Sequence, residues 1–165
     1  MTHVEEAIGE MQATAKRIDT EVRAMPAELL TWKPAPNVWT VMENLAHIEE
    51  FVPYWTAQIR QMIANPAEEW GRNQAHAGRL AAVAAVDSRT LEEVLEGIRR
   101  VVADCTAQLS AYDDAAMATQ APSRNPNWGV QPASYVLDHL LAQHIVSHCG
   151  QIQRNAAQFG SRGAV

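Results

Sequence analysis

Apolar side chains recur every three or four residues in four long stretches of the chain, the spacing that gathers them on one face of a helix. In the first stretch, which Pro26 ends, the apolar set is Val4, Ala7, Ile8, Met11, Ala15, Ile18 and Val22. In the third stretch the set is Leu91, Val94, Leu95, Ile98, Val101, Val102, Cys105 and Leu109. The pattern predicts amphipathic helices, each with one buried face.

Local signals indicate where these helices begin and end. Thr40 is followed by Glu43 in a capping box, in which the hydroxyl and the carboxylate each bind a backbone N–H of the helix start. This second helix should run to about residue 63, where Asn65–Pro66 closes it. The third helix should start at Thr90, which opens a second capping box, or at Ser88.

The fourth predicted helix begins at Pro132 and runs to about Phe159, with Gly160 as its stop. Residues 66–87 are rich in alanine, and we expect a crossover there with one short helix at most. The connection 113–131 holds prolines and a glycine, and we expect no strand anywhere in the chain.

The simplest way to bury four amphipathic faces is an all-α four-helix bundle, here a single domain over residues 1–165. The long crossover between the second and third helices would let those two run parallel. We therefore expect up-down-down-up connectivity, with up-down-up-down as the alternative.

Composition narrows the classes of function. The chain has 165 residues, 47% of them hydrophobic and 19% charged, which is the balance of a soluble globular protein. Its formal net charge of −6 argues against a nucleic-acid partner. No signal peptide or membrane-spanning run is visible, and there are only two cysteines, so we expect a soluble, cytoplasmic protein.

The candidate chemistry lies in the histidines. His144 and His148 are four residues apart, about 40° around a helix, so their side chains can converge on one point. The chain has six histidines, so this spacing alone also arises by chance. His47, in the middle of the second helix, is the best third ligand. Three imidazoles with a position left for water describe a catalytic zinc-type site, and the alternative is three core histidines bonded to other protein groups.

Other polar residues near this group have simpler explanations. Glu43 is explained by its capping box, and Glu50 by the solvated charged face of its helix. Gln151 could orient a ligand or simply pack, and the sequence does not decide. We expect the remaining histidines to be surface residues; they are His3, His76 and His139.

Two segments together, "WKPAPNVWTVMENLAHIEE" and "HIVSHCGQI", resemble the DinB/YfiT-like superfamily of metal-dependent four-helix-bundle proteins. Its members share a Trp-Ser/Thr…Glu…His element at the start of the second helix and a His-x-x-x-His-x-Gly-Gln element in the last. The resemblance implies an up-down-down-up bundle, a divalent metal (zinc or nickel) and a homodimer. It carries His47, His144 and His148 as the metal ligands.

The resemblance also implies a small-molecule substrate, since characterised relatives include thiol S-transferases that use bacillithiol or mycothiol, and a mycothiol-dependent maleylpyruvate isomerase. Our first hypothesis is a metal-dependent enzyme, either a transferase that uses a low-molecular-weight thiol or a hydrolase. The alternative is a non-enzymatic bundle that binds a ligand or serves as a dimerisation module. An open metal position beside a pocket would distinguish the first from the second.

Overall fold

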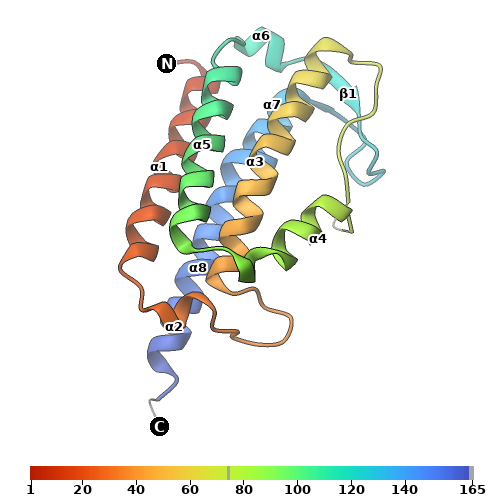
Figure 1. Ribbon diagram of the computed structural model, residues 1–165. Coiled ribbons are helices and arrows are strands. Elements are labelled where there is room, and N and C mark those ends of the chain that lie inside the picture. Colours follow the sequence, from red (N-terminus) through yellow and green to blue (C-terminus); the bar gives the residue numbers. More distant parts are fainter. Residues whose placement is uncertain (74, 164–165) are drawn as a thin grey trace.

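In a computed structural model, which describes residues 1–73 and 75–163, four long helices pack side by side (Figure 1). Helix α5 packs between α1 and α3, and α8 closes the ring by contacting both α1 and α3. The four helices are α1 (His3–Arg23), α3 (Val41–Ala64), α5 (Leu91–Leu109) and α8 (Gln143–Ser161). The predicted helical bundle is confirmed.

Capping boxes open three of these helices, and two of them were predicted. Thr40 accepts a hydrogen bond from the Glu43 N–H at 3.0 Å, and the Glu43 carboxylate accepts one from the Thr40 N–H at 2.7 Å. Thr90, rather than Ser88, caps α5 in the same way. The buried face of α1 matches the apolar pattern of the sequence almost residue for residue.

The connection between α3 and α5 crosses the length of the bundle. In Figure 1, α3 and α5 both rise from the lower end of the bundle, whereas α1 and α8 run the other way. The chain returns from the top of α3 through α4 (Ala77–Ala84) and a 3₁₀ turn, η1 (Val86–Ser88), which both contact α3. Arg72 and Arg79 of this crossover line a pocket together with His47 of α3.

The absence of strands was wrongly predicted. Strand β1 (Gln120–Pro122) pairs antiparallel with β2 (Val130–Pro132), with Ala121 opposite Gln131. The loop between them contains Gly129 at φ +60°, a conformation that glycine adopts without strain. Strands of three residues are too short to show an alternating pattern, which is why the sequence gave no signal.

The last helix also differs from its prediction at both ends. Pro132 is not in the first turn but caps α7 (Ala133–Tyr135), which continues into a π-helical segment, η2 (Val136–Ala142), and then into α8. Gly160 does not stop α8, which ends at Ser161. Its φ is not positive, so it lacks the left-handed conformation of a C-terminal glycine cap.

Two four-residue helices complete the chain: α2 (Ala27–Leu30) leads from α1 towards α3, and α6 (Asp114–Met117) follows α5. No helix among the described residues is long and apolar enough to cross a membrane.

Candidate metal centre

Three histidines from two helices meet inside the bundle. His47 comes from the second turn of α3, and His144 and His148 lie one turn apart at the start of α8. One ring nitrogen of each lies within 4.8 Å of the others, and no other such group of potential metal ligands occurs in the described part of the chain. His47 and His148 are 2% and 5% exposed, and His144 is half-buried, so one side of the group faces outward.

Two of these rings, those of His144 and His148, each form a hydrogen bond through their Nδ1 atom. The Nδ1 of His148 lies 2.8 Å from Asn44 Oδ1, and the Nδ1 of His144 lies 3.3 Å from the Leu140 carbonyl oxygen. Both partners are acceptors, so each Nδ1 carries the proton and donates it. The lone pair of each ring is therefore on Nε2, the form in which a neutral imidazole binds a metal.

Asn44 fixes the orientation of His148. It is fully buried on α3, and its Nδ2 donates to the Thr40 carbonyl at 2.8 Å, which leaves Oδ1 free for the imidazole. The amide cannot flip without placing two donors or two acceptors against each other. The first turn of α3 thus supports a ligand on α8.

We expect Asn44→Ala to weaken divalent-metal binding by about 10–100-fold, the usual effect of losing an outer-shell partner of a ligating histidine. The His148 ring would then be free to rotate and change tautomer. Competition titration with a chromogenic zinc chelator measures this. Unchanged affinity in a folded Asn44→Ala protein would show that the hydrogen bond to His148 does not support a metal site.

The surroundings of His47 differ from those of the other two histidines. Its Nδ1 is buried and has no hydrogen-bond partner, and the nearest carboxylate oxygen is Glu50 Oε2 at 3.7 Å. Glu50 in turn binds both terminal nitrogens of Arg72, whose side chain is 5% exposed. Burial raises the pKa of Glu50, but His47 and Arg72 outweigh burial and lower it to about 2. Glu50 is therefore ionised beside the His47 ring.

The three imidazoles are neutral at physiological pH. Burial is the main cause, and it lowers the pKa of His47 below its usual 6.5. Burial and the neighbouring His47 lower the pKa of His144 to about 4, and burial and His144 lower that of His148 to about 2. Neutral rings are ready to bind a cation without first losing a proton.

We expect the metal-free protein to lose stability as the pH falls from about 7.5 to about 5. In this window the unfolded chain takes up protons on these histidines, whereas the folded chain resists protonation because their folded pKa values are lowered. The expected loss is up to about 2 kcal/mol for one such histidine. Urea unfolding after chelation measures it, and His144→Gln should lose less than the wild type. Equal losses would contradict the lowered pKa of His144.

Aromatic rings surround the histidines. Phe51 stacks on His144 with ring centroids 4.0 Å apart, and Trp39 lies 5.9 Å from His148 in a stacked arrangement. The guanidinium of Arg79, from α4, lies 4.8 Å above the Trp39 ring. These contacts restrict the rotamers of the two imidazoles and keep water away from one side of the group.

Two pockets reach the histidines from the outward side. A pocket of about 660 Å³ touches all three, and polar groups including Ser147, Gln151 and Arg154 line it. A smaller pocket of about 220 Å³ touches His47 and His144 and has apolar walls. Those walls are Trp55, Trp128 and Leu140, and the smaller pocket also borders Arg72, Asn73 and Arg79.

The sequence identified the three histidines but missed their supporting residues. Glu50 was assigned to a solvated face, yet it pairs with Arg72 next to His47. Asn44 had one usable signal, its position one turn before His47. Glu43 has the capping role predicted for it and also binds Lys33 at 2.8 Å. The other histidines are exposed, as expected; they are His3, His76 and His139.

Comparison with known proteins agrees with this geometry. The family profile described as the DinB superfamily matches residues 10–152, most of the chain. The chain belongs to the DinB superfamily. A comparison with curated proteins gives no match.

Two solved structures share the fold of this DinB-superfamily chain. YfiT from Bacillus subtilis, described as a probable metal-dependent hydrolase with an unusual four-helix bundle topology, superposes with a TM-score of 0.78. It is 14% identical, over 95% of this chain and 87% of YfiT. The mycothiol-dependent maleylpyruvate isomerase superposes with a TM-score of 0.70 at 14% identity, over 90% of this chain and 60% of the isomerase. At this identity the likeness shows the fold alone.

Proposed function

We propose that this chain is a metal-dependent enzyme in which His47, His144 and His148 bind one divalent cation, zinc or nickel. The observation that carries the proposal is the convergence of three neutral imidazoles within 4.8 Å, two of which donate Nδ1–H to fixed acceptors. Histidines that only filled the core would need hydrogen-bond partners but would have no reason to bring one nitrogen of each ring this close together.

The donor set suits such a cation. Imidazole nitrogens are good ligands for zinc and nickel, and three protein ligands are typical of catalytic rather than structural zinc. The buried Nδ1 of His47, which lacks a hydrogen-bond partner, faces ionised Glu50, and a cation on the other nitrogen of that ring would strengthen this attraction. Each ligand would then have an acceptor behind it.

A divalent cation held here would act as a Lewis acid that lowers the pKa of a water or thiol beside it. The protein supplies the walls of the substrate pocket and a polar group beside it. Trp55, Trp128 and Leu140 form an apolar wall next to His47 and His144. Gln151 borders the larger pocket beside His148 and can hydrogen-bond a substrate.

Two reactions fit this arrangement, hydrolysis by water and transfer of a group to a low-molecular-weight thiol. We favour thiol transfer, because the described residues that line the two pockets include no Asp or Glu, and their only histidines are the three proposed ligands, so no side chain there is left to serve as a base for water. A thiol loses its proton far more easily than water and needs no such base. The mycothiol dependence of the isomerase with the same fold supports this choice.

The up-down-down-up connectivity is part of the proposal. It is supported by Arg72 and Arg79, which belong to the connection between α3 and α5 and line a pocket together with His47 and His144. We also propose that the protein acts in the cytoplasm, which rests on its having only two cysteines, and as a homodimer, which rests on the family resemblance.

Cobalt substitution tests whether the metal position is open. We expect the cobalt-loaded protein to develop sulfur-to-metal charge-transfer absorption when cysteine or glutathione is added, since a catalytic site leaves a position for the thiol. Cobalt-loaded His139→Ala, altered at an exposed histidine, should behave like the wild type. Cobalt that binds without any spectral response to thiols would indicate a closed shell and a structural role.

A further inference from the structure

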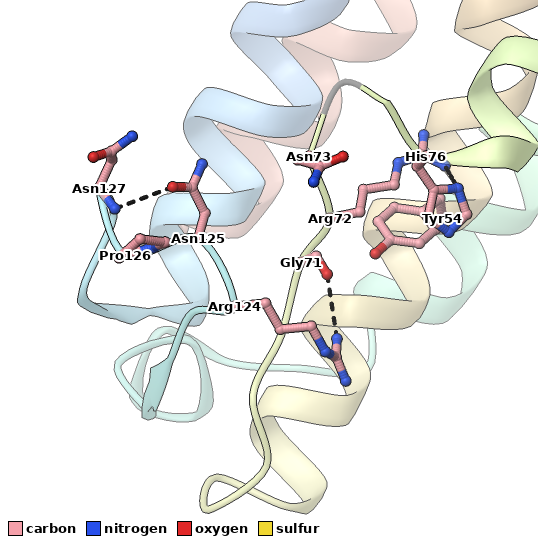
Figure 2. A pocket seen from close by; sticks show the side chains of 9 residues that line it. All are labelled: Tyr54, Gly71, Arg72, Asn73, His76, Arg124, Asn125, Pro126 and Asn127. Carbon is pink, nitrogen blue, oxygen red and sulfur yellow. Dashed lines mark hydrogen bonds between the residues drawn. The ribbon is translucent and has the colours of Figure 1, made fainter.

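A third pocket, called the Arg124 pocket below, lies next to the histidine site and has a different lining. It measures about 640 Å³ and lies between the start of the crossover and the loop that follows β1 (Figure 2). Tyr54, Arg72, Asn73 and His76 form one wall, and residues 124–127 form the other. Arg72 and Asn73 also line the smaller pocket that touches His47 and His144, so the two pockets share these wall residues and are neighbours.

The charged residues that line the Arg124 pocket are basic, whereas the whole chain has a net negative charge. The protein has 19 acidic residues and 13 lysines and arginines, yet two arginines and no carboxylate line this pocket among the described residues. Glu50 neutralises Arg72. Arg124 has no carboxylate within ion-pair distance in the described chain, and its one side-chain hydrogen bond goes to the Gly71 carbonyl at 3.2 Å. Its remaining N–H groups can bind a ligand.

Two asparagines add donors to the same pocket. The Oδ1 of Asn73 accepts from the Ala75 N–H at 3.0 Å, and the Oδ1 of Asn125 accepts from the Asn127 N–H at 3.0 Å. Figure 2 shows the second of these bonds within the 124–127 wall. No described residue accepts a hydrogen bond from either Nδ2, so the side-chain NH₂ groups of both asparagines can donate to a ligand.

We propose that the Arg124 pocket binds the anionic group, a carboxylate or a phosphate, of the substrate. Arg124 supplies the charge, and the amide groups of Asn73 and Asn125 supply neutral donors. As a statement about the substrate of the metal centre, this inference rests on the function proposed above. The substrate is then a small acidic molecule whose reacting end lies at the histidines and whose anionic end lies at Arg124.

Titration with simple anions tests this without a known substrate. We would add inorganic phosphate, and separately succinate, at constant ionic strength and follow the side-chain N–H signals of arginine and asparagine by NMR. The full-length protein is used as purified and again after its metal has been chelated and the chelator dialysed away. We expect saturable shifts at Arg124 and Asn125 in both forms.

Variants identify the contact. Arg124→Gln should weaken binding of the better anion by about tenfold, as for loss of one charge-assisted contact, whereas Arg124→Lys should keep most of it. Arg100→Gln, at an exposed arginine on α5, should have no effect. A preference for phosphate or for succinate decides between the two sources of the charge.

The results separate this inference from the metal proposal. Metal binding with no saturable shift, or with equal anion binding by Arg124→Gln, would overturn the anion pocket alone. Anion shifts in a protein that takes up no divalent metal would support the anion pocket and overturn the proposed enzyme. Shifts confined to Arg154, in the larger pocket beside the histidines, would also contradict this assignment.

Discussion

His148→Ala should abolish stoichiometric metal binding. The substitution removes one of three nitrogens and leaves Oδ1 of the fully buried Asn44 without its 2.8 Å partner. We expect the affinity for zinc to fall by more than the roughly 10–100-fold that loss of an outer-shell partner costs. Isothermal titration of the chelated protein with zinc measures this loss.

Two further proteins make the His148→Ala result interpretable. His139→Ala, at an exposed histidine in the helical turn before α8, should bind zinc like the wild type. His144→Ala should lose binding as His148→Ala does, without disturbing Asn44. Circular dichroism establishes that each variant is folded. Retention of tight zinc binding by both His144→Ala and His148→Ala would exclude these residues as ligands.

Trp70→Ala should cause the largest loss of stability of any single change discussed here. Trp70 is fully buried, stacks on Trp128 at 5.4 Å and donates its indole N–H to the Ala121 carbonyl at 3.0 Å. Its backbone also bonds to the β1 region, through Pro122 and Arg124. Truncation should cost about 3–5 kcal/mol of unfolding free energy, the usual range for a buried aromatic residue. Urea denaturation measures this cost.

Matched substitutions separate packing from hydrogen bonding at this position. Trp70→Phe keeps most of the buried ring and should cost about 1–3 kcal/mol, chiefly through loss of the indole hydrogen bond to the Ala121 carbonyl. Trp32→Ala removes a half-buried tryptophan that packs edge-on against Phe159 at 5.5 Å, and it should cost less than Trp70→Ala. If Trp70→Ala cost no more than Trp32→Ala, Trp70 would not be the anchor between the crossover and β1.

The bundle was predictable because its signals are local. A capping box needs only two residues three apart, and both predicted boxes, at Thr40 and Thr90, form as expected. An amphipathic face needs only a repeat, and the buried positions of α1 follow it. The two histidines of α8 were also within reach, since one turn of a helix sets their separation.

The remaining features depend on contacts between distant segments. Arg72 reaches Glu50 from the crossover, 22 residues further along the chain, and no local pattern marks that pairing. Asn44 meets His148 across 104 residues. The β1–β2 hairpin is held to Trp70 by backbone hydrogen bonds and an indole contact, so its three-residue strands depend on tertiary structure rather than on their own sequence.

The metal content of the wild-type protein tests the central claim most directly. The protein is purified without a nickel column, and inductively coupled plasma mass spectrometry measures every divalent metal per chain. We predict about one divalent ion per chain, zinc or nickel, bound by the three converging neutral histidines. Protein that contains no divalent metal and takes up neither zinc nor nickel would contradict the metal centre and the enzyme proposed on it.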